Sequence, residues 1–375
     1  MNKLLFVFGT RPEALKLAPL ILAAKKDRRF SVEVCFTGQH REMAFQVLDL
    51  FRLKADYDLN VMKPNQSLSL LTERLISKLD PVMKKSKPNV VIVQGDTTSA
   101  FVGALSSYYH KVPVAHVEAG LRSFDKYQPF PEELNRAFAG RIADWHFAPT
   151  AGAAKNLLDE NTDRKKVYIT GNTVVDALKT VYGRLNLKNA VLAGEILKRK
   201  NRIILATTHR RENFGKPLEE ICSAFSELTR RHSDIEILFL VHKNPKVQKT
   251  VYRMLSRNRR IHLIPPVDYL EFLTMMKFSY LIISDSGGVQ EEAPTFHKPV
   301  LVLRNVTERP EGVKIGAAKL VGSDFKKITS EASKLLSNKK AYLRMSSRKN
   351  PYGDGRTSRR ILNILNRCLS KKNAR

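Results

Sequence analysis

Residues 90–118 read VVIVQGDTTSAFVGALSSYYHKVPVAHVE, and this stretch contains one complete repeat of the fold that we expect. It starts with the strand-like run Val90–Gln94, continues through a helical segment at Thr98–Tyr109, and ends with a second strand-like run at Val114–Val117. The order of strand, helix and strand is typical of a parallel sheet covered by helices.

The same alternation extends through both halves of the chain. In the first half, further strand-like runs lie at residues 4–8, 31–37, 145–148 and 167–170. A second series lies at residues 202–207, 235–241, 261–264, 280–284 and 299–303. Two such series predict an α/β protein with two doubly wound, Rossmann-like units.

We expect an N-terminal domain at residues 1–171 and a second domain at residues 172–351. Residues 172–200 are helical and charged without a strand signal, so we interpret them as the connection between the domains. Residues 352–375 carry apolar side chains at helical spacing, such as Ile361 and Leu365, and predict a final helix that returns to complete the first domain.

The composition is that of a globular protein, with 43% hydrophobic residues in a chain of 375. No apolar run approaches the roughly 20 residues that a membrane-spanning helix needs. The opening MNKLLFVFGTRPE has only a short apolar stretch before Gly9, so we expect neither a signal peptide nor a membrane anchor. Cys35, Cys222 and Cys368 lie far apart without a CxxC pair, which argues against a disulfide framework or a zinc site and fits a reducing cytoplasm.

The chain is strongly basic, with a formal net charge of +29 and a pI near 10.1. A nucleic-acid ligand is one interpretation of this charge. The basic residues are spread out, however, and clusters such as 84–87 and 257–260 lack interleaved aromatic residues and any RNA-binding signature. We therefore do not expect nucleic acid as the main ligand. The positive charge also has another use, because it attracts a diphosphate substrate.

Three carboxylates lie close behind strand-like runs of the first half. Asp96 and Glu118 each follow such a run, and Glu132 comes soon afterwards. Side chains at the carboxyl ends of strands in open α/β sheets face the crevice in which ligands bind. We therefore predict acid/base chemistry for these residues. The alternative for Asp96 is that it caps the helix that follows it.

The usual phosphate loops are absent, because neither GxGxxG nor GxxxxGK[ST] occurs. Residues 8–13, FGTRPE, follow the first strand-like run. Gly9 permits the turn, Pro12 suits the first helical position, and Arg11 can bind a phosphate at the helix mouth. An ordinary turn with a solvated arginine is the alternative.

Residues 284–288, SDSGG, leave a strand of the second half and lead into a helix. Here the backbone amides at Gly287 and Gly288, and the hydroxyl of Ser286, can approach a diphosphate closely. Glu292, further along, can accept hydrogen bonds from a ribose diol. A glycine-rich turn followed by a capping acid is the alternative.

His209 follows the first strand-like run of the second half and stands next to Arg210 and Arg211. The arginines disfavour a cationic imidazole unless a phosphate or a carboxylate compensates. A solvated basic turn is one interpretation. If this basic turn faces the three carboxylates across a cleft, His209 and the two arginines would instead bind an anionic group of a ligand.

Ten motifs occur in order along nearly the whole chain: FGTRPEALKLAPL, TGQHREM, QGDTTSA, HVEAGLRS, PEELNR, ITGNTVVDAL, HRREN, SDSGGVQEEAP, TERPEG and NPYGDG. Together they resemble the non-hydrolysing UDP-N-acetylglucosamine 2-epimerase family. The resemblance implies the glycosyltransferase B architecture, in which two Rossmann-like domains face each other and the active site lies in the interdomain cleft. The chain shows no Cys/His metal set, so the sequence itself requires neither a metal nor a nicotinamide cofactor.

The family reaction inverts carbon 2 of the sugar by elimination of UDP to 2-acetamidoglucal and re-addition. It converts UDP-N-acetylglucosamine reversibly to UDP-N-acetylmannosamine. By motif match, Glu118 is the expected base at carbon 2, and Asp96 or Glu132 serves the opposite face. The resemblance implies further site residues, namely His209, Arg11, Ser286 and Gly287 at the departing diphosphate, Lys16 and Arg309 assisting there, and Glu292 at the ribose.

Bacterial members of the family also bind a second UDP-N-acetylglucosamine as an activator. The matching positions are Gln39, His40, Arg74, Arg210, Glu212 and His242. The resemblance further implies a homodimer in the cytoplasm whose product supplies a surface polysaccharide or a wall polymer.

Other functions stay open on the sequence. A glycosyltransferase of the same architecture would pass N-acetylglucosamine from UDP to an acceptor, because a fold does not choose a reaction. A hydrolysing 2-epimerase would share the elimination but release free N-acetylmannosamine and UDP. A basic nucleic-acid-binding protein with a vestigial cleft is a third class.

Overall fold

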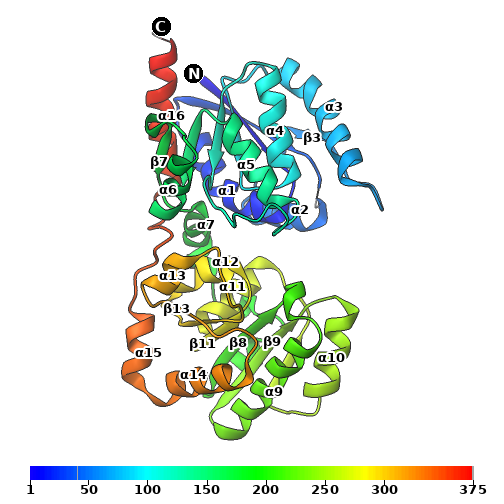
Figure 1. Cartoon of the computed structure of the whole chain (residues 1–375), viewed down its shortest axis with the longest axis vertical. Coiled ribbons are helices and arrows are strands. Elements are labelled where there is room, and N and C mark those ends of the chain that lie inside the picture. The colour runs from blue at the N-terminus through cyan, green and yellow to red at the C-terminus, as the bar shows by residue number, and fades with distance from the viewer. Residues whose placement is uncertain (40, 374–375) are drawn as a thin grey trace. The chain divides into compact units, whose positions relative to one another are not determined.

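The computed structural model describes residues 1–39 and 41–373, which form two compact α/β units (Figure 1). The first unit comprises Met1–Thr180 and the segment from Tyr352 on, and the second comprises Val181–Pro351. The chain therefore leaves the first unit after Thr180, nine residues beyond the boundary expected at 171, and re-enters it at Tyr352.

The first unit is built on a seven-stranded sheet in the order β3-β2-β1-β4-β5-β6-β7. All neighbouring strands are parallel, and the order reverses between β1 and β4. The strands are β1 (Asn2–Phe8), β2 (Phe30–Phe36), β3 (Tyr57–Asp58), β4 (Val90–Gln94), β5 (Val114–Val117), β6 (Trp145–Ala148) and β7 (Val167–Ile169).

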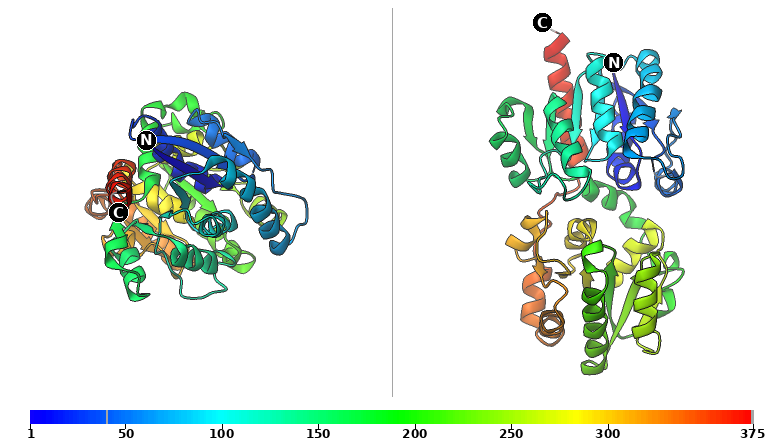
Figure 2. Two further views of the ribbon diagram at one scale, coloured as in Figure 1. Left: turned by 90° about the horizontal axis from the view of Figure 1, so that it is seen from above. Right: turned by 45° about the vertical axis from the view of Figure 1, so that its right-hand side comes forward.

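Helices cover both faces of this sheet (Figures 1 and 2). Helices α3, α4 and α5 pack side by side, and α1 packs against α2 and α16. The helices are α1 (Arg11–Lys25), α2 (Arg41–Leu50), α3 (Leu68–Ser86), α4 (Thr98–Tyr109), α5 (Glu132–Ile142), α6 (Ala151–Asp159), α7 (Thr173–Val181) and α16 (Thr357–Asn373), with a short 3-10 turn at η1 (Arg164–Lys166).

The central strand β4 of the first unit is buried on both faces. In β4, Val90, Val91, Ile92 and Val93 are all fully buried. Parallel strands between two layers of helices lose water on both sides, which explains why continuous apolar runs predicted them. The predicted α/β class with Rossmann-like units is confirmed by this sheet and by the sheet of the second unit.

The second unit has a six-stranded parallel sheet in the order β10-β9-β8-β11-β12-β13. The strands are β8 (Arg202–Thr208), β9 (Ile235–Val241), β10 (Ile261–Ile264), β11 (Leu281–Ser284), β12 (Val300–Val302) and β13 (Ala318–Leu320). The helices are α8 (Gly194–Leu197), α9 (Lys216–Arg231), α10 (Pro245–Leu255), α11 (Tyr269–Phe278), α12 (Gly287–Glu292), α13 (Pro310–Lys314), α14 (Phe325–Ser337) and α15 (Lys339–Ser346). The 3-10 turns are η2 (Tyr182–Arg184), η3 (Leu187–Asn189), η4 (Arg211–Asn213) and η5 (Ala293–Phe296). None of the helices in the described residues is both long and apolar enough to span a bilayer.

The last helix, α16, is bonded to the first unit at its start. Asp176 of α7 is 6% exposed and accepts hydrogen bonds from the backbone N–H groups of Thr357 and Ser358 at 3.2 and 2.8 Å. A helix N-terminus leaves four such groups without an intrahelical partner, and Asp176 satisfies two of them. Because α16 also packs along α1, it is an integral part of the first unit.

We expect Asp176→Ala to lower the free energy of unfolding by about 2–6 kcal/mol, because each of two buried amides loses an acceptor at roughly 1–3 kcal/mol. Urea unfolding at neutral pH measures the loss. Asp354→Ala is the matched control, since Asp354 pairs with Arg360 at 2.7 Å at an exposed position. Such a pair contributes about 0–1 kcal/mol, so equal losses in the two variants would contradict the anchoring role of Asp176.

Candidate active site

The predicted carboxylates lie beyond the carboxyl ends of neighbouring strands in the first unit. Asp96 follows β4 by two residues, Glu118 directly follows β5, and Glu132 opens α5. Since β1, β4 and β5 are adjacent in the sheet, the loop that leads into α1 lies at the same edge. This edge contains the switch point of the sheet, the usual place for a ligand in such folds.

Glu118 is held in a strained and specific position. Its φ of +63° is in the left-handed region, which costs of order 1 kcal/mol or more for a residue other than glycine. Its side chain is 7% exposed, and the Lys16 ammonium donates to both carboxylate oxygens at 2.8 and 2.5 Å. The Asn172 amide donates to Oε2 at 2.8 Å. The sequence predicted Lys16 at the diphosphate, and the structure shows it bonded to Glu118.

Asp96 is fixed by α5. Its carboxylate forms an ion pair with Arg136, and its backbone oxygen accepts a hydrogen bond from the Asn135 amide at 3.1 Å. The cap of α4 is Thr97, whose hydroxyl accepts from the N–H of Ala100 at 3.0 Å. The alternative interpretation of Asp96 as the helix cap is therefore wrong, and its carboxylate, 30% exposed, is available for chemistry.

Glu132 differs from the other two carboxylates in its electrostatics. Burial raises the pKa of Glu132, the nearby charge of Asp96 raises it further, and Arg136 offsets part of this rise. Asp96, by contrast, has the guanidinium of Arg136 as a direct partner. With its raised pKa, Glu132 holds a proton more readily than an ordinary glutamate does.

A buried carboxylate that the sequence analysis did not single out ties two loops of this edge together. Glu13 is 1% exposed and accepts hydrogen bonds from the N–H groups of Gly9 and Thr10 at 3.1 and 2.8 Å, and from the Thr97 hydroxyl at 2.7 Å. Burial raises the pKa of Glu13 to about 7. Helix α1 begins at Arg11, directly after Thr10. Pro12 is therefore its second residue, whereas the sequence predicted Pro12 at the first helical position.

Gly9 is required by space at this turn. A Cβ atom at Gly9 would lie 2.0 Å from the Thr37 hydroxyl and 2.4 Å from the Ser99 hydroxyl. The two hydroxyls are 2.7 Å apart, and Ser99 donates to the side chain of Gln39 at 2.9 Å. Gln39, one of the predicted activator residues, is thereby bonded to Ser99 of α4.

His116 positions the turn that precedes Asp96. Its Nε2 lies 2.7 Å from the carbonyl oxygen of Gly95, and because a carbonyl only accepts, Nε2 carries the proton. Burial lowers the pKa of His116 to about 4, so the ring is neutral near pH 7. His116 therefore acts as a fixed neutral donor to the Gly95 carbonyl.

In the second unit, His209 lies at the end of β8 and Asp285 at the end of the adjacent β11. Nδ1 of His209 is 2.9 Å from the Asp285 carboxylate, which is fully buried, while the imidazole is 45% exposed. Burial by itself would raise the pKa of Asp285, but bonds from His209, Arg210 and Asn213 lower it. Asp285 thus supplies the carboxylate that the basic sequence around His209 required.

Ser286, Gly287 and Arg309 come together next to this pair. Ser286 caps α12, and the guanidinium of Arg309 lies over Gly287, where a Cβ would be 3.1 Å from Arg309 Cζ. Arg309 Nε donates to Glu291 at 2.9 Å. Glu292 is only 4% exposed and accepts a hydrogen bond from the Tyr269 hydroxyl at 2.7 Å.

The predicted activator residues divide between the units. Gln39 and Arg74 lie in the first unit, where Arg74 donates to Gln66 at 2.6 Å. Three others lie in the second unit near His209. Arg210 donates to the backbone oxygen of Asp285 at 3.1 Å, and the ring centroid of His242 is 6.5 Å from that of His209. Glu212, on η4, accepts a hydrogen bond from Arg304 at 2.9 Å. The remaining predicted residue, His40, lies outside the described residues.

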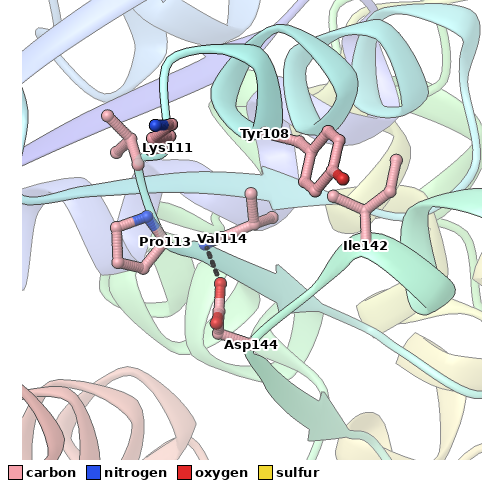
Figure 3. Close-up of a pocket in the computed structure, with 7 residues that line it drawn as sticks. Tyr108, Lys111, Pro113, Val114, Ile142 and Asp144 are labelled. Atoms are coloured by element: carbon pink, nitrogen blue, oxygen red, sulfur yellow. Dashed lines mark hydrogen bonds between the residues drawn. The ribbon is translucent and has the colours of Figure 1, made fainter.

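A surface pocket of about 310 Å³ lies at the other end of β5 (Figure 3). Tyr108, Pro113, Ile142 and Asp144 are among its lining residues, and Asp144 accepts from the N–H of Val114 at 2.9 Å. No predicted site residue lines this pocket. In the described part of the chain, no group of three or more His, Cys, Asp or Glu side chains could hold a metal ion.

Comparison with known proteins shows the family of the chain. Residues 22–366 match a family model described as UDP-N-acetylglucosamine 2-epimerase. The chain is similar to the UDP-N-acetylglucosamine 2-epimerase of Salmonella typhimurium, with 47% identity over 369 residues that cover 97% of this chain and 98% of the relative.

Two solved structures extend the comparison to the fold. The UDP-GlcNAc 2-epimerase of Neisseria meningitidis, bound to UDP-GlcNAc, superposes with a TM-score of 0.91 and 46% identity over 97% of this chain and 99% of that one. The enzyme of Methanocaldococcus jannaschii, in complex with UDP-GlcNAc and UDP, has a TM-score of 0.81 and 36% identity over 97% and 99%. The resemblance carried by the ten motifs is confirmed, and the chain belongs to the UDP-N-acetylglucosamine 2-epimerase family.

Proposed function

We propose that the protein interconverts UDP-N-acetylglucosamine and UDP-N-acetylmannosamine by elimination of UDP to 2-acetamidoglucal and re-addition, as a non-hydrolysing 2-epimerase. Family membership supports the reaction, and the relative from Neisseria meningitidis was solved with UDP-GlcNAc bound. The observation that carries the mechanism is the set of three carboxylates with different partners at one sheet edge: Asp96 with Arg136, Glu118 with Lys16, and Glu132 with a raised pKa.

The chemistry needs more than one acid/base group. Carbon 2 has no adjacent carbonyl, so its hydrogen is not removed by simple enolisation. In the elimination, a base takes the hydrogen from carbon 2, its electron pair forms the bond to carbon 1, and UDP leaves with the electrons of the carbon–oxygen bond. Re-addition of UDP to carbon 1 and of a proton to the other face of carbon 2 then gives the epimer.

Glu118 is our choice for the base at carbon 2. Its two hydrogen-bond donors, Lys16 and Asn172, both favour the ionised carboxylate. Glu132, with its raised pKa, serves as the proton donor on the opposite face, next to Asp96 as a fixed negative charge. In the reverse direction the base and the acid exchange roles.

The leaving diphosphate gains negative charge as its bond breaks and needs fixed donors. We propose that Arg11 of the first unit, and His209, Ser286, Gly287 and Arg309 of the second, supply them. Lys16 adds positive charge beside Glu118, and Glu292 binds the ribose. In this proposal the first unit contributes the proton chemistry and the second binds most of the UDP.

A second UDP-N-acetylglucosamine as activator and a homodimer belong to the same proposal. Exposed apolar side chains on α4 and α5, Tyr108, Tyr109, Leu134 and Phe138, between 43% and 64% exposed, support a self-association surface. Sedimentation equilibrium tests it, since a monomer at micromolar concentration would rule the dimer out. The free cysteines, among them buried Cys35 and Cys222, support a reducing compartment such as the cytoplasm.

Product analysis separates the proposed reaction from its competitors. With UDP-N-acetylglucosamine as the only additive, we expect ¹H NMR to show UDP-N-acetylmannosamine, and the same final mixture when the reaction starts from that product. Free N-acetylmannosamine with UDP would establish a hydrolysing enzyme, and turnover only with an added sugar acceptor would establish a transferase. Salt-sensitive oligonucleotide binding without turnover would favour the nucleic-acid class.

A further inference from the structure

Asn172 lies in the loop between β7 and α7 and uses each of its polar groups. Its Nδ2 donates to Glu118 Oε2 at 2.8 Å, its Oδ1 accepts from the N–H of Val174 at 3.0 Å, and its own N–H donates to the carbonyl of Tyr352 at 2.6 Å. The residue is 2% exposed. Because Oδ1 faces a donor, the amide orientation is fixed and the NH₂ group points to the carboxylate.

The loop that carries Asn172 has little freedom. Gly171 before it has a φ of +91°, and a Cβ there would lie 2.8 Å from the hydroxyl of Thr357 at the start of α16. A Cβ on Gly353 would meet the backbone of Asn172 at 3.4 Å. The chain that re-enters the first unit at Tyr352 therefore packs against this loop and holds the amide in place.

Glu118 receives two different donors. Lys16 supplies a positive charge on a flexible four-carbon stem, which attracts the carboxylate without fixing its direction well. The planar amide of Asn172 is held by its bond from the Val174 N–H, so the direction of its hydrogen bond to Glu118 Oε2 is fixed. Direction matters, because a misplacement of about 1 Å at a reacting group can cost about 10²-fold in rate.

We propose that Asn172 is a positioning residue of the epimerase, which orients the Glu118 carboxylate for proton transfer at carbon 2. This inference rests on the proposed role of Glu118 as the base. Asn172 acts through Glu118 and makes no contact with the reacting atoms itself. Its effect therefore falls on turnover and on the ionisation of Glu118, and not on substrate binding.

The variant that tests this is Asn172→Asp. It keeps the acceptor for the Val174 N–H and the backbone bond to Tyr352, and it replaces only the donor to Glu118 with a carboxylate oxygen. We expect kcat to fall about 10- to 100-fold, with KM for UDP-N-acetylglucosamine changed less than about threefold. Since a neighbouring negative charge favours the protonated form of Glu118, the acid limb of the kcat profile should move to higher pH.

Two further variants complete the test. Asn89→Asp adds the same charge at the other end of β4, where the side chain accepts from the Lys3 N–H at 2.7 Å, and should leave kcat and the profile unchanged. Asn172→Ser replaces the aspartate variant if that variant does not fold. Serine keeps a short acceptor for the Val174 N–H but cannot reach Glu118, so it should also lower kcat and move the acid limb of the kcat profile to higher pH.

The outcomes distinguish a failure of the positioning role of Asn172 from a failure of the proposed epimerase function. If Glu118→Gln is inactive while the Asn172 variants keep wild-type kcat and pH profile, the positioning role is overturned and the epimerase proposal stands. If Glu118→Gln keeps wild-type turnover, the role of Glu118 itself fails. A shift of KM with unchanged kcat in Asn172→Asp would also overturn the inference, because it would place Asn172 in substrate binding.

Discussion

Glu118→Gln should lower the turnover of UDP-N-acetylglucosamine by about 10²- to 10⁴-fold, the usual contribution of a general base. An amide cannot take the carbon 2 hydrogen. The affinity for UDP, measured by calorimetry, should change little, because the lost interaction belongs to the transition state. Asp96→Asn and Glu132→Gln should also cut turnover strongly. Glu160→Gln is the control, since Glu160 pairs with Arg122 at 2.6 Å and is 41% exposed.

The partner of Glu118 gives a second readout of the same variant. Lys16 has a side chain only 11% exposed, and Glu118→Gln removes the negative charge that its ammonium contacts at 2.5 Å; breaking a buried ion pair costs roughly 3–5 kcal/mol in stability. Replacing both residues, as in Lys16→Met with Glu118→Gln, should restore much of the stability but not the turnover. Recovery of turnover in the double variant would contradict the role of Glu118 as the base.

Asp285→Ala should destabilise the second unit by roughly 3–5 kcal/mol, because it removes the partner of several buried donors. The carboxylate accepts from the Thr208 hydroxyl at 2.8 Å, the Arg210 N–H at 3.0 Å and the Asn213 amide at 2.9 Å. Urea unfolding at pH 7 measures the loss. Asp324→Ala is the control, since Asp324 caps α14 at an exposed position and its loss should cost about 0.5–2 kcal/mol.

Asp285 also predicts a pH dependence. Its pKa in the folded protein is lowered, so the stability it contributes is complete above the unfolded value of about 3.9 and is lost as the pH falls through the folded value. As the pH falls below about 5, the wild-type protein should therefore lose stability more steeply than Asp285→Asn. Parallel curves for the two proteins would contradict the ion pair between Asp285 and His209.

Much of the fold follows from local sequence. The runs at Val90–Gln94, Ile235–Val241 and Ile261–Ile264 are strands with the predicted bounds, because most of their side chains are apolar, as is typical of parallel strands covered by helices. The strands β3 and β13 were missed, since they have two and three residues and include the charged side chains of Asp58 and Lys319. Segments this short carry no periodic signal.

The site was predictable where position along the chain decides the chemistry. Asp96 and Glu118 follow buried strands, and the same rule could have identified Asp285 directly after β11. Glu13 stands three residues after Thr10, a spacing typical of a capping box. Asn172 could not be predicted in this way, because it meets Glu118 across 54 residues and depends on how β7 and α16 bring the loop to β5.

In the proposed mechanism, a base removes the carbon 2 hydrogen, and that hydrogen exchanges with solvent before UDP adds again. Incubation with UDP-N-acetylglucosamine in heavy water, followed by ¹H NMR of the carbon 2 position, tests it most directly. We expect deuterium at carbon 2 of the UDP-N-acetylmannosamine formed, and in the substrate pool as the reaction reverses. Formation of UDP-N-acetylmannosamine that retains its original carbon 2 hydrogen, or no exchange at all, would contradict the account.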